Sequence, residues 1–201
     1  MNITLFSQNI YLKNKVDLPH KKILNEIKKL PWDKVMPQIK HPSYDTRQYI
    51  SKYNLLDTIP SKNLIKNVMK ECVTEAINNF GYDSSFKICN SWANKILPQN
   101  ISEFHNHKNF WLSLVYYPHG NFTIDFKKHD MEFFEIKTKK QNSFNNNMCS
   151  VDVKQGDIII FPAYMLHKIG YNNTKENRYS IAVNILPKGV IGQNDGELNI
   201  K

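Results

Sequence analysis

Three of the seven histidines in this 201-residue chain are spaced so that they could bind one metal ion. His105 and His107 are separated by one residue, and residues i and i+2 of an extended strand project from the same face. His167 follows about sixty residues later, beyond the apolar run 158–161. Two imidazoles on one strand and a distant third form a three-point site with open positions, which suits catalysis by iron, zinc or manganese.

Arg178 is a second candidate for chemistry, because it is one of only two arginines among 27 basic residues. It begins an alternating segment, one face of which carries Arg178, Ser180, Ala182 and Asn184. A planar guanidinium grips a carboxylate through two parallel hydrogen bonds, which the point charge of lysine cannot do. We therefore predict a carboxylate-binding face. The alternative is an ordinary ion pair with Glu176 or Asp157.

The motifs fall in one order along the chain. That order is Ser91-Trp92, His105-x-His107, the aromatic run 111–117, the apolar run 156–162, His167 and Arg178-x-Ser180. It resembles the Fe(II)- and 2-oxoglutarate-dependent oxygenases, in particular a prolyl-hydroxylase-like branch common in phages and marine bacteria. The resemblance covers about residues 85–190, and the combined order is more specific than any one element.

The resemblance implies a double-stranded β-helix, or jelly roll, with Fe(II) and 2-oxoglutarate as cofactor and cosubstrate. His105, His107 and His167 would be the iron ligands. The distal carboxylate of 2-oxoglutarate would pair with Arg178, and Ser180 and Tyr117 would hydrogen-bond it. We prefer Tyr117 to its neighbour Tyr116 because Tyr117 follows the strand parity of His105. The implied reaction uses O2 to hydroxylate a C–H bond of a small-molecule or peptidyl substrate, coupled to decarboxylation of 2-oxoglutarate to succinate.

One residue departs from the usual pattern of this superfamily. Most members have a carboxylate as the second ligand, where this chain has His107, although relatives with a His-x-His motif share the exchange. Three neutral imidazoles leave the metal one negative charge short. Glu103 shares the strand parity of the two histidines and could supply a carboxylate, and Asp125 is another candidate. A degenerate, non-catalytic site is a further alternative.

Two other classes of protein share some of these features. Cupins also use His-x-His and a later histidine, but the glutamate that they place a few residues after the pair is missing here, and they give no reason for Arg178-x-Ser180. A non-catalytic binding module could use the lysine-rich surface to hold an anionic partner.

The elements that must position these residues divide into a helical part and a β part. Apolar spacing predicts helices over 21–30 and 61–80, the second ended by Gly81, with an irregular stretch at 38–60. Strands are expected over 86–93, 110–117, 121–126, 131–136, 151–154, 157–161 and 178–185. The fold class is therefore mainly β with N-terminal helices (α+β), a jelly roll buttressed by helices. We expect a single domain, residues 1–201, with 1–84 as helical leader and support and 85–190 as catalytic core.

The composition indicates which classes of partner and which cellular compartment to expect. The net charge is +9, but the lysines are spread along the chain and arginine is scarce, which does not favour nucleic acid. No apolar run reaches the roughly 18 residues of a membrane span, and the N-terminus does not read as a signal peptide. Three widely spaced cysteines suggest a reducing compartment. We expect a cytoplasmic protein, in the host cytoplasm if a phage encodes it.

Overall fold

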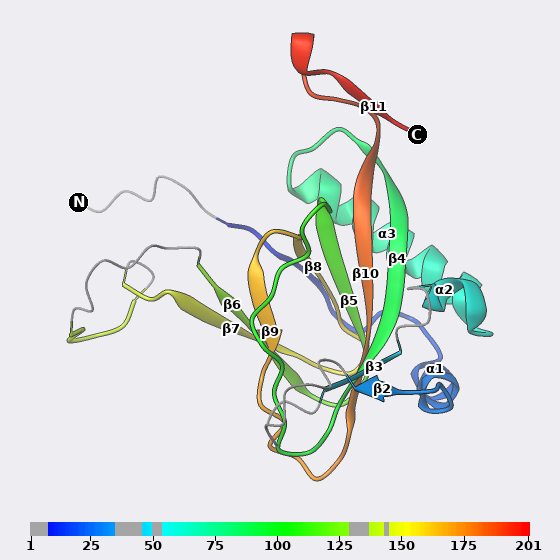
Figure 1. The fold of residues 1–201 in the computed structure, drawn as a ribbon, viewed down its shortest axis with the longest axis vertical. Coiled ribbons are helices and arrows are strands. Elements are labelled where there is room, and N and C mark those ends of the chain that lie inside the picture. The colour runs from blue at the N-terminus through cyan, green and yellow to red at the C-terminus, as the bar shows by residue number, and fades with distance from the viewer. Residues whose placement is uncertain (1–7, 35–45, 50–53, 129–136, 143–144) are drawn as a thin grey trace.

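The computed structural model describes residues 8–34, 46–49, 54–128, 137–142 and 145–201. Two antiparallel sheets form the body of the protein, and the helices lie along one of them (Figure 1). None of the helices in these ranges combines the length and hydropathy needed to cross a membrane.

The larger sheet has the strand order β1-β8-β5-β10-β4-β3-β2. Its strands are β1 (Tyr11–Lys13), β8 (Ile158–Pro162), β5 (Leu112–His119), β10 (Arg178–Ile191), β4 (Ser85–Ile96), β3 (Thr46–Tyr49) and β2 (Asp33–Lys34). The far end of β10 pairs with β11 (Leu198–Ile200), and this hairpin, which contains the 3-10 turn η3 (Asn194–Gly196), extends beyond the rest of the fold (Figure 1).

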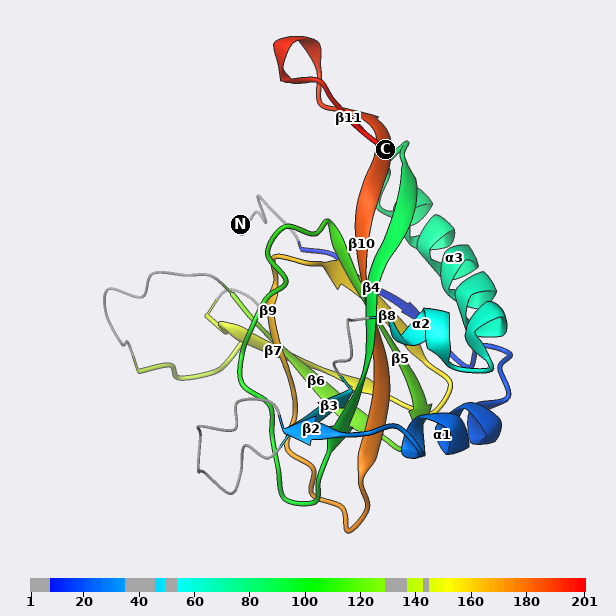
Figure 2. The same cartoon turned by 45° about the vertical axis from the view of Figure 1, so that its right-hand side comes forward.

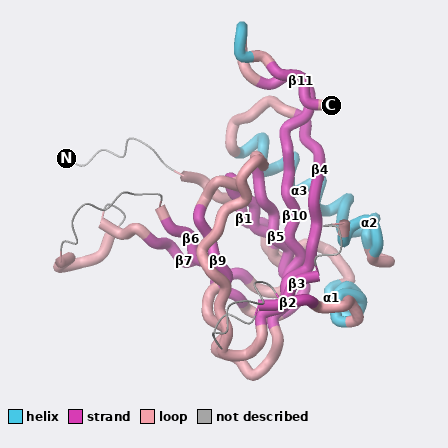
Figure 3. The backbone as a smooth tube through the Cα atoms, viewed as in Figure 1, coloured by secondary structure: helices cyan, strands magenta, loops and turns pink. Residues whose placement is uncertain are grey.

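The smaller sheet has the order β7-β6-β9, made of β7 (Met148–Val153), β6 (Phe122–Lys127) and β9 (Leu166–Ile169). From β5 to β10 the chain passes back and forth between the two sheets, which is the winding of a jelly roll (Figure 3). A buried apolar cluster fills the space between the sheets, with Tyr117 and Phe161 from the larger sheet and Phe122 and Phe126 from the smaller.

Three helices cover the outer face of the larger sheet: α1 (His20–Lys28), α2 (Leu55–Thr58) and α3 (Lys62–Asn79) (Figure 2). Their apolar faces bury Ile23, Ile27, Ile65 and Met69 against that sheet. Gly81 follows α3 with φ of +78°, a left-handed conformation that glycine adopts without steric cost. The central strands β5 and β8 are therefore buried on both faces along nearly their whole length.

The fold class predicted from the sequence is confirmed, and both predicted helices are present. The expected helices 21–30 and 61–80 are His20–Lys28 and Lys62–Asn79, although the apolar Leu64 in the first turn of the second is 51% exposed. The irregular stretch 38–60 contains β3 and α2, while its residues 38–45 and 50–53 lie outside the described ranges.

The strand boundaries differ more from expectation. β4 and β10 extend beyond the predicted 86–93 and 178–185, because each continues past the alternating apolar residues on which the prediction depended. β1 and β9 are too short to give a periodic signal and were not predicted. The strand expected at 131–136 lies outside the described residues.

Candidate active site

The structure brings together the three histidines that the sequence singled out. One ring nitrogen from each of His105, His107 and His167 lies within 4.8 Å of the others. The ring centroids are separated by 4.4 Å between His105 and His167, 5.0 Å between His107 and His167, and 5.3 Å between His105 and His107. Since metal–imidazole bonds are about 2.1 Å long, small rotations of the rings would let all three reach one ion. We call these residues the histidine cluster.

The backbone that carries His105 and His107 is not the strand that the His-x-His spacing predicted. Residue 105 makes a single antiparallel bridge to His167, in which the two residues exchange N–H···O bonds of 3.0 and 2.9 Å. The N–H of His107 donates to the carbonyl of Ala163 at 2.9 Å, and Asn109 then turns the chain with φ of +70°. The segment thus extends the smaller sheet beside β9 for a short distance, which suffices to orient both rings.

Two rings of the histidine cluster are held by main-chain carbonyls. Nδ1 of His105 lies 2.9 Å from the carbonyl oxygen of Glu103, and Nδ1 of His167 lies 2.9 Å from that of Met165. A carbonyl oxygen can only accept, so each Nδ1 must carry the hydrogen. The Nε2 atoms of the neutral rings then keep a lone pair for a metal ion, as in histidine–metal sites generally.

His107 is held differently, by side chains from two strands. Its Nδ1 lies 2.7 Å from Oδ1 of Asn184 on β10 and 2.8 Å from Oγ of Ser113 on β5. The rings of His107 and Trp92 also pack edge to face, with 5.3 Å between centroids. Neither Asn184 nor Ser113 is assigned a role from the sequence. The available signals were a polar residue within an apolar run for Ser113 and, for Asn184, its place on the same face as Arg178.

Two of the three imidazoles in the histidine cluster are uncharged at physiological pH. Burial, followed by the proximity of His105, lowers the pKa of His107 to about 4. The same two causes lower the pKa of His167, which is 4% exposed, to about 3. Neutral imidazole is the form that binds metal ions, so no proton has to leave these two rings first.

Neither carboxylate that the sequence offered as an alternative ligand joins the cluster. Among the described residues, one cluster of histidine, cysteine or acidic side chains is close enough to hold a metal, and it consists of the three histidines alone. Glu103 contributes its main-chain oxygen to His105, as described above. Asp125 accepts a hydrogen bond from Ser150 at 2.7 Å and lies 3.8 Å from the ammonium of Lys168. Its neighbour Phe126 pairs with His167, so strand alternation turns Asp125 to the opposite face.

The guanidinium of Arg178 is buried and contacts no carboxylate in the described part of the chain. Its Nη1 donates to the carbonyl of Tyr171 and its Nη2 to Oδ1 of Asn173, both at 3.1 Å. Its Nε is buried and has no partner among the described residues. The alternative of an ion pair with Glu176 or Asp157 is therefore not what these residues form. Burial lowers the pKa of Arg178, as expected for a cation shielded from water.

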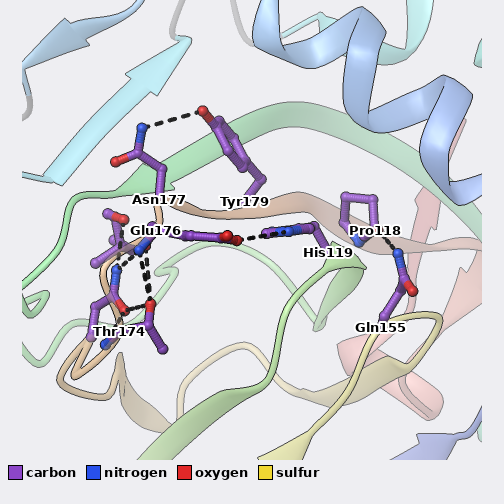
Figure 4. Close-up of polar contacts among 9 residues, drawn as sticks. Pro118, His119, Gln155, Thr174, Glu176, Asn177 and Tyr179 are labelled. Carbon is purple, nitrogen blue, oxygen red and sulfur yellow. Dashed lines mark hydrogen bonds and ion pairs between the residues drawn. The ribbon is translucent and has the colours of Figure 1, made fainter.

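The loop 170–177 that orients Arg178 is itself anchored at several points (Figure 4). Glu176 on this loop lies 3.6 Å from Nε2 of His119, at the end of β5. Buried Asn172 donates to the carbonyls of Ile96 and Glu176 and accepts two hydrogen bonds from Thr174. These contacts hold the two oxygen atoms that bind the guanidinium at the start of β10.

Tyr117 and Tyr116 point to opposite faces of β5. The hydroxyl of Tyr116 lies on the helix side, 2.6 Å from Nδ1 of His20. Tyr117 lies between the sheets, fully buried, and its hydroxyl has no partner among the described residues. Its ring contacts Phe122 with 4.8 Å between centroids, and the guanidinium carbon of Arg178 lies 5.4 Å from the same ring. Ser180, also fully buried, accepts a hydrogen bond of 3.4 Å from Asn94.

Residues 90–184 match the model of a protein family described as "Putative 2OG-Fe(II) oxygenase". This range spans the histidine cluster, Arg178, Ser180, Tyr117 and Asn184. This match, which covers a little under half of the chain, indicates a 2-oxoglutarate-dependent Fe(II) oxygenase. Fe(II) and 2-oxoglutarate, the cofactor and cosubstrate predicted from the sequence, are those of this family, and the match favours an oxygenase over a cupin or a binding module. No curated protein sequence matches the oxygenase.

Several solved structures share the fold of the oxygenase. HygX from Streptomyces hygroscopicus, with nickel and 2-oxoglutarate bound, has a TM-score of 0.61 at 12% identity over 90% of this chain and 83% of its own. The alpha ketoglutarate dependent carbocyclase SnoK from nogalamycin biosynthesis has 0.64 at 9% identity, over 89% and 79%. A prolyl-4-hydroxylase from Pseudomonas putida has 0.58 at 11% identity, over 91% and 95%. These likenesses extend to the helical part as well as the jelly roll.

Proposed function

We propose that the histidine cluster binds Fe(II), that Arg178, Ser180 and Tyr117 bind 2-oxoglutarate, and that the enzyme hydroxylates a C–H bond of its substrate. The observation that carries this proposal is the state of the histidine cluster. Each Nδ1 is engaged by an oxygen atom, which leaves Nε2 of each ring as the available ligand atom, and the three rings lie close enough to share one ion. Imidazole nitrogen suits Fe(II), and three protein ligands leave positions for small molecules.

The residues around Arg178 fit a carboxylate. Two buried polar atoms, Nε of Arg178 and the hydroxyl of Tyr117, have no partner in the described structure, and both belong to side chains that contact Phe122. Burying a polar group without a partner costs about 1–3 kcal/mol, so a ligand that satisfies both atoms regains that free energy. A carboxylate has the acceptor capacity for both.

One face of β10 connects the two halves of the proposed site. Asn184 contacts His107 at one end of this face and Arg178 lies at the other, with only the small side chains of Ser180 and Ala182 between them. Small side chains leave room for a short diacid along the strand. When bound, Fe(II) and 2-oxoglutarate together reduce dioxygen, and the oxoacid is converted to succinate and CO2 as the substrate is hydroxylated. The protein contributes orientation and a surrounding apolar shell that limits access of water.

The substrate would approach over His105, the exposed member of the histidine cluster. We propose a small molecule or a peptidyl side chain, with O2 as the second cosubstrate. We further propose that residues 85–190 are the catalytic core, supported by 1–84 within one domain, and that the enzyme is cytoplasmic. The three cysteines, all unpaired, suit a reducing compartment.

Two measurements test the proposed function. Under argon, addition of Fe(II) and then 2-oxoglutarate should produce a metal-to-ligand charge-transfer absorption band. In air, the same mixture should release succinate, since oxygenases of this class turn over slowly without substrate. The double variant His105→Ala, His107→Ala should give neither signal. A wild-type protein that binds Fe(II) but shows no band with 2-oxoglutarate would overturn the proposal.

A further inference from the structure

His107 differs from the other two histidines in what holds its ring. His105 and His167 are oriented by main-chain carbonyls, whereas the Nδ1 of His107 meets two side-chain oxygens, at 2.7 Å from Asn184 and 2.8 Å from Ser113. His107 is also the ligand that stands where most of the superfamily has a carboxylate. The orientation and tautomer of the His107 ring therefore depend on two side chains, each of which can be substituted separately.

Asn184 and Ser113 are direct neighbours across two strands. They are opposite each other in the register of β10 and β5, on the face that looks between the sheets. Asn184 is 5% exposed and Ser113 is fully buried. Polar side chains at such positions cost free energy unless they form hydrogen bonds, and the ring of His107 supplies their shared partner.

The amide oxygen of Asn184 determines which nitrogen of His107 carries the hydrogen. The amide oxygen of Asn184 can only accept, so the contact of 2.7 Å is a hydrogen bond only when Nδ1 has its hydrogen. In the other tautomer, the lone pair of Nδ1 would face the lone pairs of Asn184, and Nε2 would carry a hydrogen instead of binding a metal. The Ser113 hydroxyl can accept from the same N–H.

Resting on the proposed metal-binding function, we propose that Asn184, assisted by Ser113, is a positioning residue that fixes His107 in the Nδ1–H tautomer and thereby makes its Nε2 a metal ligand. The acceptor is a neutral amide, so it orients the ring without adding the negative charge that a carboxylate partner would bring. Asn184 thus fixes the orientation of the histidine that stands in place of the usual carboxylate. It adds no negative charge to the site.

Metal affinity without 2-oxoglutarate tests this role directly, with Co(II) as a spectroscopic probe in place of Fe(II). Asn184→Leu has nearly the same shape but no acceptor, and we expect it to weaken Co(II) binding about tenfold to hundredfold. Asn184→Asp keeps the acceptor and should bind Co(II) at least as tightly as the wild type. Ser113→Ala should cost less than tenfold. As a matched control, Ser91→Ala removes a buried hydroxyl of β4 that accepts, among the described residues, from the N–H of Leu56, and it should leave the affinity unchanged.

The tautomer itself can be measured in the metal-free protein by nitrogen-15 NMR of the imidazole rings. We expect the hydrogen of His107 on Nδ1 in the wild type and in Asn184→Asp, and a shift towards Nε2 in Asn184→Leu. Should Asn184→Leu fail to fold, Asn184→Ala replaces it. A wild-type hydrogen on Nε2, or unchanged Co(II) affinity in a folded variant without the acceptor, would overturn the inference. A wild type that binds no Co(II) would instead contradict the proposed function, while the NMR result would still decide what Asn184 does to the ring.

Discussion

Arg178 and Tyr117 lie on neighbouring strands, β10 and β5, and both contact the ring of Phe122. The guanidinium carbon is 5.4 Å from the centroid of that ring, and the ring of Tyr117 is 4.8 Å from it. Each residue has one buried polar atom without a partner in the described structure, Nε in one case and the hydroxyl in the other. These two unused donors beside one aromatic ring are the groups that we propose bind a carboxylate of 2-oxoglutarate.

Arg178→Lys should weaken 2-oxoglutarate binding while metal binding stays intact. The lysine keeps the charge but loses the planar fork, and a hydrogen bond to a charged group is worth about 1.5–3 kcal/mol, or roughly 10- to 100-fold in affinity. Titration of 2-oxoglutarate into the Co(II)-loaded protein measures the change. Equal 2-oxoglutarate affinity in the variant and the wild type would contradict the assignment of Arg178.

Tyr117→Phe should weaken 2-oxoglutarate binding without lowering the stability of the ligand-free protein. Because the hydroxyl is buried without a partner, its removal should leave the free energy of unfolding of the ligand-free protein unchanged or slightly higher. The affinity for 2-oxoglutarate should fall about tenfold, since one hydrogen bond to a carboxylate is lost. Urea unfolding and ligand titration give the two quantities. A variant that is clearly less stable without ligand would mean that the hydroxyl has a structural partner.

Single substitutions should show that the metal is held by histidine alone. His107→Ala should lower the affinity for Co(II) by more than about a hundredfold, because a direct ligand is removed. Glu103→Gln and Asp125→Asn should change it less than about threefold, since neither carboxylate is grouped with the histidine cluster. Isothermal titration with Co(II) compares the three. Loss of binding in either carboxylate variant would restore that residue as a ligand.

The metal-free protein should lose stability in mildly acidic solution. Histidine in the unfolded chain titrates near 6.5, whereas in the folded protein the pKa values of His107 and His167 are lowered to about 4 and about 3. Between these limits the unfolded state binds more protons, so the free energy of unfolding falls as the pH falls from about 6.5 towards 4. Each residue contributes up to about 1.4 kcal/mol per pH unit.

Urea unfolding in the presence of a chelator, at intervals from pH 7.5 to pH 4, measures this dependence. His167→Asn removes one of the two titrating rings, so its profile should be flatter than that of the wild type. Parallel profiles for the two proteins would show that the acid sensitivity comes from other groups.

The histidine cluster could be predicted from the sequence because two of its three members are close together in the chain. Two histidines at i and i+2 share a face in any extended segment, and a single bridge at residue 105 was enough to satisfy that condition. Arg178 stood out because this chain otherwise prefers lysine. The alternation of 178–184 is enough by itself to place Ser180 and Asn184 on the face of Arg178.

Other features depend on contacts between distant strands, which spacing in one segment does not encode. The pairing of Asn184 with Ser113 requires the register of β10 against β5, and that register shifts between Tyr179 and Ile181. The contact between the smaller sheet and residue 105 requires β9, a strand of four residues with no periodic signal. Glu103 has the parity of a ligand, yet its carboxylate is not grouped with the rings of its neighbours, because the chain is not a continuous strand there.

The exchange of backbone hydrogen bonds between His105 and His167 joins two points about sixty residues apart, with strands of both sheets between them. A cation shared by these residues would act as a removable cross-link. By analogy with a disulfide that closes a loop of this length, such a link is worth up to about 4 kcal/mol of unfolded-state entropy. Loading the metal would then do more than prepare the enzyme for turnover. It would also make the metal-loaded molecule more resistant to proteolysis than the metal-free one.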